Sequence, residues 1–219
     1  MPPRGQLMEQ AYQTTKLRLL TGGYRAGDSI SVEDLVAELG TSRQPVMDAL
    51  RRLATERFIE IIPQVGVRVV VPNRRDVLDF FRLLAATEAV CAALAAERAD
   101  KSGAAKLTEV NKQIGQLLSD DIDNELRARR YRDFNRDFHR QLNTLAQSNI
   151  LTPIADFMWD HSDFFISSAF DVRLLMERLR AAYEEHDAVC RAVAANDPES
   201  ARQAMEDHVL AFARNIEHG

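Results

Sequence analysis

The sequence of 219 residues lacks the features that are typical of disulfide-rich secreted proteins, small zinc-binding domains and membrane proteins. Its two cysteines, Cys91 and Cys190, are too few for a disulfide framework, and no CxxC pair of the zinc-binding kind is present. No run approaches the 18 apolar residues that a membrane-spanning helix needs. The first ten residues contain Arg4 and Glu9 and no apolar stretch, unlike a signal peptide. We therefore expect a cytoplasmic protein with no membrane partner.

The composition, with 46% hydrophobic and 28% charged residues, is typical of a globular chain and excludes collagen-like or low-complexity sequences. A net charge of −5 would weigh against nucleic-acid binding if the charge were evenly spread. It is not, because residues 1–73 hold nine Lys/Arg and eight Asp/Glu, whereas residues 74–219 hold 19 and 25. The acidic total is thus the average of a nearly neutral part and an acidic part.

Glycine and proline thin out at the same place. Six of the nine glycines and five of the seven prolines precede residue 74, and they punctuate short segments. Long helical patterns follow. We therefore predict two domains, with residues 1–73 as the first and residues 74–219 as the second.

The first domain has the pattern of a winged helix-turn-helix. Helical periodicity covers residues 7–21 and 32–39, and a further helix follows Thr41-Ser42. Two β-branched runs, 58–62 and 67–71, flank a turn that contains proline and glycine, which predicts a hairpin. Two short helices joined by a tight turn at Gly40, followed by a hairpin, indicate a DNA-binding unit.

Such units present the start of their second helix to the major groove. Here Arg43 is suited to guanine and Gln44 to adenine, while Ser42 and the first helical amides are suited to a phosphate. Further candidates are Arg51 and Arg52 on the helix, and Gly66 and Arg68 on the hairpin. The alternative is that these arginines only form a solvated helix face.

Three segments of this domain resemble the winged-helix domain of GntR-type bacterial transcription regulators. They are LGTSRQPV at 39–46, ALRRL at 49–53 and GVRV at 66–69. The resemblance implies a double-stranded DNA operator. Two positions depart from the usual form: Met47 stands where a second base-reading arginine is common, and Glu33 where arginine is frequent. We include Met47 among the DNA-contacting candidates, and we do not carry the family's usual operator sequence over.

The second domain contains six helical patterns, at about 74–101, 104–119, 123–147, 149–169, 171–196 and 198–217. No strand-like alternation is present. The whole chain is therefore predicted to be mostly α, with an N-terminal winged helix-turn-helix that carries a small β-hairpin wing and a C-terminal all-α six-helix bundle.

Three histidines of the second domain are predicted to point into this bundle. His139 lies on an apolar helix face four residues after Asn135, and His186 and His208 align with apolar residues of the last two helices. Bundle cores build metal sites from inward side chains of facing helices. The alternative is that each histidine is an ordinary core residue.

Residues 74–217 resemble the FCD ligand-binding domain of the FadR subfamily, in NRDFH at 135–139, Glu185-His186 and His208. A domain of six helices, instead of seven, resembles the VanR-type branch of this subfamily. The resemblance implies that Asn135, His139, His186 and His208 hold a divalent metal ion such as Zn, Ni or Mn. It also implies an organic-acid effector beside that metal.

A carboxylate effector needs a cationic partner besides the metal. Many family members have an arginine four residues before a glutamate of the first helix, but here Leu84 precedes Glu88. Arg82, Arg132 and Arg136 are the candidates that remain. His161 either supports the metal ligands or lies at the surface.

We expect a homodimeric DNA-binding regulator, and repression is the commoner behaviour of the family. We do not expect an enzyme. Two alternatives stay open: a sensor in which the metal itself is the signal, and a helical metalloenzyme in which Glu185 is a possible base.

Overall fold

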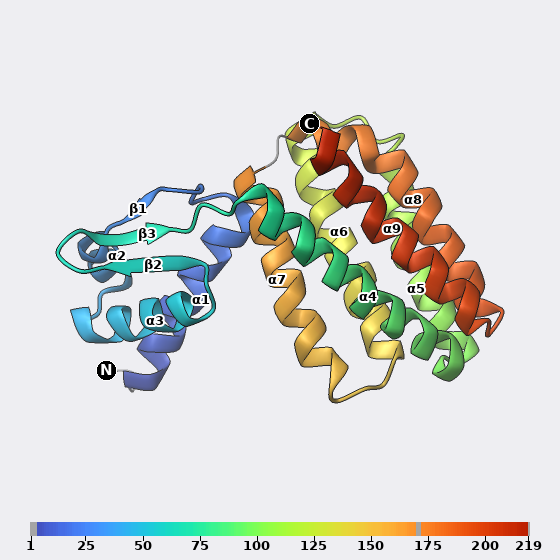
Figure 1. Ribbon diagram of the computed structural model, residues 1–219, viewed down its shortest axis with the longest axis horizontal. Coiled ribbons are helices and arrows are strands. Elements are labelled where there is room, and N and C mark those ends of the chain that lie inside the picture. Colours follow the sequence, from blue (N-terminus) through green and yellow to red (C-terminus); the bar gives the residue numbers. More distant parts are fainter. Residues whose placement is uncertain (1–3, 170–171, 219) are drawn as a thin grey trace. The chain divides into compact units, whose positions relative to one another are not determined.

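The structure is a computed structural model that describes residues 4–169 and 172–218. Its contacts group the chain into two compact units (Figure 1). The winged-helix unit comprises Met1–Asn73 and Asp160–Phe170, and the helical unit comprises Arg74–Trp159 and Asp171–Gly219. The segment that begins at Asp160 therefore packs with the first unit, although the predicted boundary assigned it to the second domain.

The winged-helix unit contains three helices and a small sheet. The helices are α1 (Arg4–Thr21), α2 (Val32–Leu39) and α3 (Arg43–Thr55). The strands β1 (Ser29–Ile30), β2 (Ile59–Ile62) and β3 (Gly66–Val69) form an antiparallel sheet in the order β1-β3-β2. The predicted winged helix is confirmed, with β1 as an additional strand on the outer side of β3.

Short-range backbone signals fix both ends of α2. Ser31 adopts an extended backbone, and its side chain accepts a hydrogen bond from the backbone N–H of Asp34 at 3.1 Å. Gly40 ends the helix in the left-handed conformation, with a φ of +58°. These two ends fix the short turn that leads into α3.

The wing is a hairpin whose register pairs Ile62 with Gly66. The backbone of Gly66 has a φ of +129°, a conformation that essentially only glycine adopts. The first strand ends at residue 62 as predicted, and the other three strand limits differ by one or two residues, because only residues 59–62 and 66–69 pair.

The core of the winged-helix unit joins the helices to the sheet. Leu19 of α1, Leu50 of α3 and Phe58, just before β2, are fully buried in it. Phe164 of the helix α7 (Leu151–Ala169) is also fully buried there. The hydroxyl of Ser167 in α7 donates to the backbone oxygen of Leu19 at 2.9 Å. The sequence carries no signal for this contact, because an apolar residue does not indicate which of two cores it joins.

Among the described residues, the helical unit contains five whole helices and the first part of α7, up to Trp159. The whole helices are α4 (Arg74–Arg98), α5 (Lys101–Gln116), α6 (Asn124–Leu145), α8 (Val172–Ala194) and α9 (Pro198–His218). α4 packs along α9, α9 against α8, and α5 against both α6 and α8 (Figure 1). The predicted all-α bundle is confirmed. No helix among the residues described is long and apolar enough to cross a membrane.

Candidate DNA-reading face and histidine cluster

The exposed start of α3 is free to meet a ligand. Ser42 occupies the N-cap position, yet its side chain makes no capping hydrogen bond. The first turn of α3 contains no acidic residue, so the positive end of the helix is not neutralised from within. Arg43 and Gln44 are exposed beside it. This arrangement suits an anionic group such as a DNA phosphate.

The side chains predicted to read bases are paired with carboxylates. Arg43 donates to Glu33 of α2, and both side chains are largely exposed. Within α3, Asp48 accepts hydrogen bonds from Gln44 at 3.0 Å and from Arg51 at 2.7 Å. The long polar side chains on this face therefore have defined directions in the free protein.

Two of the predicted DNA contacts on α3 are engaged elsewhere. Met47 is half-buried and packs against the core of the winged-helix unit. The guanidinium of Arg52 lies 3.6 Å from the ring centre of Tyr12 in α1, and it also bonds Glu9 and Glu56. Arg52 thus ties α3 to α1.

The wing presents its predicted residues to solvent. Gly66 and Arg68 are exposed on β3, and Arg68 lies directly opposite Glu60 of β2. Directly opposite residues of an antiparallel pair lie on the same face of the sheet, so the two side chains share one exposed face of the wing.

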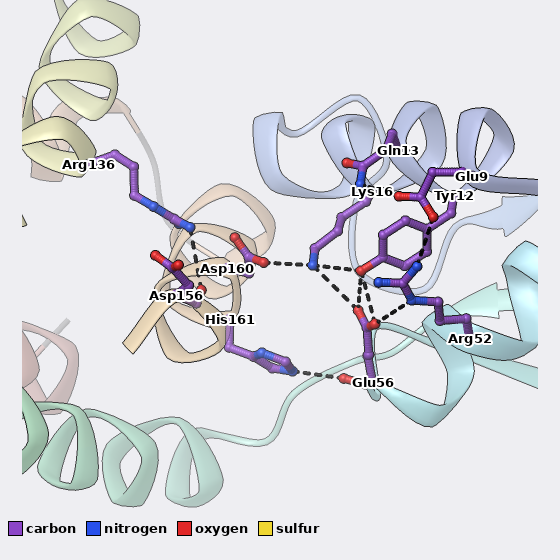
Figure 2. Close-up of polar contacts among 10 residues, drawn as sticks. All are labelled: Glu9, Tyr12, Gln13, Lys16, Arg52, Glu56, Arg136, Asp156, Asp160 and His161. Atoms are coloured by element: carbon purple, nitrogen blue, oxygen red, sulfur yellow. Dashed lines mark hydrogen bonds and ion pairs between the residues drawn. The ribbon is translucent and has the colours of Figure 1, made fainter. Parts of the chain in front are cut away.

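A polar network joins the part of α7 from Asp160 onward to the rest of the winged-helix unit (Figure 2). Lys16 of α1 pairs with Asp160 at 2.6 Å, and the Tyr12 hydroxyl donates to the Glu56 carboxylate at 2.7 Å. The Nε2–H of His161 donates to the backbone oxygen of Glu56 at 2.8 Å. His161, whose role the sequence left open, is buried in this unit, where its ring stacks on Phe58.

In the helical unit, three histidines from three helices meet. His139 of α6, His186 of α8 and His208 of α9 are all buried, and each offers one ligand atom within 4.8 Å of the others. The Nε2 atoms of His186 and His208 lie 3.1 Å apart. The structure therefore brings together the three histidines that the sequence singled out.

Carboxylates hold the outer nitrogens of two of these rings. The Nδ1–H of His139 donates to Glu88 of α4 at 2.7 Å, and the Nδ1–H of His208 donates to Glu185 at 2.8 Å. Glu88 is itself fully buried and also accepts from the side chain of Asn143 at 3.1 Å. A carboxylate on Nδ1 leaves the lone pair on Nε2, as in metal-bound histidines.

Burial keeps the imidazoles of His139 and His186 neutral. It lowers the pKa of His139 to about 4, against the opposing effect of Glu88. Burial and the neighbouring His208 lower the pKa of His186 well below its usual value. At neutral pH both rings are therefore unprotonated, which is the form that binds a metal ion.

Buried polar atoms without a partner gather at the same residues. Among the described residues, neither Nε2 of His139 nor Oδ1 of Asn135, one helical turn earlier, has a hydrogen-bond partner. Nδ1 of His186 and Nε1 of Trp159 are also buried without one. The ring of Trp159 lies 3.9 Å from that of His139, centre to centre. Three imidazoles and an unpartnered amide oxygen fit a divalent metal ion.

The arginines proposed for the effector occupy different settings. Arg82 is exposed and bonds Asp79 at 2.9 Å. Arg132 is half-buried on α6. Arg136 donates to the backbone oxygen of Asp156 at 3.4 Å (Figure 2). Burial is the main cause of the low pKa of His139, and the positive charge of Arg136 lowers that pKa further. Of the three, Arg136 has the clearest electrostatic link to the histidine cluster.

Sequence reasoning did not assign four residues around the cluster: Glu88 and Glu185 as partners of the histidines, the indole of Trp159, and Arg178. Arg178 bonds Glu185 at 2.7 Å and thereby extends the chain that ends at His208. A signal existed for Glu88, a charged residue in an otherwise apolar stretch of α4, since buried charges are rare without a partner. Trp159 gave no comparable signal.

Comparison with known proteins agrees with both units. Residues 7–69 match the family described as bacterial regulatory proteins, gntR family, and residues 79–211 match the FCD domain. The chain is 25% identical to the Exu regulon transcriptional regulator of Escherichia coli, over 93% of this chain and 82% of that protein. It is 30% identical to the Nta operon transcriptional regulator of Aminobacter aminovorans, over 58% of each chain.

Solved structures share the fold. Escherichia coli McbR/YncC superimposes with a TM-score of 0.78 at 21% identity, over 100% of this chain and 99% of that one. The crystal structure of a putative transcriptional regulator GntR from Rhodococcus sp. RHA1 gives a TM-score of 0.76 at 20% identity. That comparison covers 97% of this chain and 98% of that one. With a winged helix and an FCD domain each matched in sequence, the chain belongs to the GntR family of bacterial transcription regulators, in the FadR-like group that carries an FCD domain.

Proposed function

We propose that this protein is a homodimeric repressor whose affinity for a DNA operator is controlled by an organic-acid effector at a divalent metal site in the helical unit. The observation that carries the metal site is the convergence of His139, His186 and His208, with carboxylates on the outer nitrogens of two rings. Relatives that are transcriptional repressors, such as GlaR of Escherichia coli, support repression as the output.

The proposed metal ligands are His139, His186, His208 and Oδ1 of Asn135. A bound divalent ion would supply a fixed positive charge that attracts a carboxylate. Glu88 and Glu185 orient two of the imidazole rings and keep their protons on Nδ1. The uncharged oxygen of Asn135 leaves a higher net charge at the site than an aspartate would.

For the effector, the chain offers donors beside the metal ligands. The unpartnered Nε1–H of Trp159 supplies one hydrogen bond, and Arg136 supplies positive charge. Arg132 and Arg82 complete the set that we assign to effector binding, with Arg132 on the same helix as His139. A small anion with several oxygen atoms is the ligand class that such donors favour.

On DNA, we assign base reading to Arg43 and Gln44 and phosphate contacts to Ser42 and Arg51. Gly66 and Arg68 bring the wing to the backbone. Basic side chains displace counterions from DNA, so the affinity should fall steeply as salt is added. Two winged-helix units in a dimer would read two half-sites of a palindromic operator.

The test uses the full chain and duplexes selected from a random library. Elemental analysis should find a divalent metal in the wild type and none after His139→Ala combined with His186→Ala. Fluorescence anisotropy should then show that one acid from a panel of small organic acids changes the DNA affinity of the wild type alone. Full metal retention in the double variant would overturn the metal site.

Two other functions predict different results. If the metal itself is the signal, metal titration should change DNA affinity with no acid present. If the bundle is a metalloenzyme, the purified protein should turn over a substrate. Glu185 is a poor candidate for its base, because it already accepts from His208 and Arg178. Sedimentation velocity tests the homodimer independently of these choices.

A further inference from the structure

The pair formed by Glu33 and Arg43 joins the two helices of the helix-turn-helix at the face that would meet DNA. Glu33 lies in the first turn of α2, and Arg43 is the first residue of α3. The side chain of Arg43 is 64% exposed and that of Glu33 is 73% exposed. The pair therefore lies at the surface of the unit and not in its core.

The local electrostatics favour this partner for Arg43. A guanidinium at the positive end of a helix is unfavourably placed, and α3 has no acidic residue in its first turn to compensate. Glu33 lies at the positive end of α2, where a carboxylate is stabilised. Hydrogen bonding to its own backbone and to Arg43 lowers the pKa of Glu33, so that it is ionised at neutral pH.

The geometry of the guanidinium allows Arg43 to bind two partners at once. Arginine has five N–H donors in one plane, and a carboxylate on one edge leaves another edge open. Bidentate pairing with O6 and N7 of guanine uses one edge. A side chain whose plane is already fixed loses less conformational freedom when it binds.

The same carboxylate weakens contacts that carry no sequence information. An arginine paired with a glutamate forms a unit with no net charge, whereas a single arginine gains affinity from every phosphate it approaches. Met47, one turn after Arg43, offers no charge to replace it. The pair thus favours base reading over binding to random DNA.

We propose that Glu33 is a positioning residue for DNA recognition, which holds the guanidinium of Arg43 so that its open edge reads a guanine. This inference rests on the proposed DNA-binding function. It assigns a role to an exposed carboxylate beside the start of α3, and it predicts higher discrimination between the operator and random DNA.

The chain offers a matched control on the same helix. Glu38 of α2 also pairs with an arginine, Arg18 of α1, and is likewise exposed. Glu33→Gln and Glu38→Gln therefore remove the same charge from the same helix. Only the first variant frees an arginine of α3.

The experiment compares the full-length variants on duplexes that the wild type selects from a random library, on their single-base variants and on one random duplex. Glu33→Gln should bind the random duplex more tightly and increase the salt slope of binding by about one. Its preference for guanine at one position should fall about tenfold. Glu38→Gln should keep the wild-type preference, and thermal unfolding should show both variants folded.

Each other result has a separate meaning. An unchanged preference in Glu33→Gln, with a wild type that selects a sequence, overturns the role of Glu33 and leaves DNA recognition intact. If Glu33→Gln still lowers base preference in an Arg43→Ala background, Glu33 reads a base itself and the positioning role is wrong. A wild type that selects no sequence overturns the proposed function itself.

Discussion

The indole ring of Trp159 lies 3.9 Å from the imidazole ring of His139, centre to centre, and tilts by 32° against it. The next residue in α7, Asp160, belongs to the winged-helix unit, where it pairs with Lys16 of α1 at 2.6 Å. Trp159 and Asp160 are therefore consecutive residues of α7, of which the first contacts the histidine cluster and the second pairs within the winged-helix unit.

The adjacency of these two residues along α7 predicts that Asp160→Asn weakens the response to ligand without removing the metal site. The variant loses the charge that pairs with the half-buried ammonium of Lys16. We expect the change in DNA affinity caused by metal and effector to shrink by about 1 kcal/mol, within the usual range of allosteric coupling. Metal content should stay at the wild-type level.

Glu109→Gln is the control for this experiment, because it removes an exposed carboxylate that pairs with Lys112 three residues away. It should leave the response unchanged. Equal responses of Asp160→Asn and the wild type would show that α7 does not transmit the signal through this ion pair.

Much of the winged helix could be predicted because its signals are local. Ser31 and Gly40 mark the ends of α2 through their own backbone preferences, and the turn before Gly66 marks the hairpin. The strand at Ser29–Ile30 could not be predicted, because two residues show no alternation and their pairing with β3 is a tertiary contact. The burial of Phe164 in the core of the winged-helix unit could not be predicted either, because it is also a tertiary contact.

The histidine cluster was predictable in part. Helical spacing placed His139, His186 and His208 on apolar faces, and the structure brings them together. Their carboxylate partners were harder to assign, since Glu88 precedes His139 by 51 residues and only packing of α4 against α6 joins them. Spacing along one helix carries no information about the residue that a neighbouring helix supplies.

Glu88→Gln tests the role of this partner. Glutamine keeps an oxygen that can accept from Nδ1 of His139 but removes the negative charge that makes the ring a stronger ligand. We expect the affinity for divalent metal to fall about 10- to 100-fold, as for other outer partners of metal ligands. Competition with a chelator of known affinity measures the change.

The control for this variant is Glu97→Gln, an exposed glutamate on the same helix. It should bind metal like the wild type. Because Glu88 is fully buried, urea unfolding should accompany the titration and establish that Glu88→Gln is folded. A folded Glu88→Gln with wild-type metal affinity would contradict the proposed role.

The metal-free protein should lose stability as the pH falls. His139 has a pKa of about 4 in the folded chain and about 6.5 when unfolded. Between these values the unfolded state binds a proton that the folded state excludes, so the free energy of unfolding decreases as the pH drops from about 6.5 to about 4. The full contribution is about 3 kcal/mol for this residue.

Urea unfolding in the presence of a chelator, at pH values from 7.5 to 4.5, measures this effect. His139→Asn cannot take up the proton, so its stability should decline less steeply than that of the wild type over the same range. Parallel curves for the two proteins would mean that His139 titrates normally when folded.

Replacing each of two adjacent arginines of α3 by alanine should change a different property, DNA affinity for one and stability for the other. Arg51 is exposed on the same helix face as Gln44, where it donates a hydrogen bond to Asp48. Arg52 instead lies over the ring of Tyr12. Arg51→Ala should weaken binding to every duplex and lower the salt slope by about one, with unchanged stability. Arg52→Ala should instead lower the free energy of unfolding by about 1 kcal/mol through the lost cation–π and ion-pair contacts, and keep the wild-type base preference. Anisotropy across a salt series, together with urea unfolding of both variants, separates the two roles. A loss of base preference in Arg52→Ala at unchanged stability would show that Arg52 contacts DNA and does not mainly stabilise the fold.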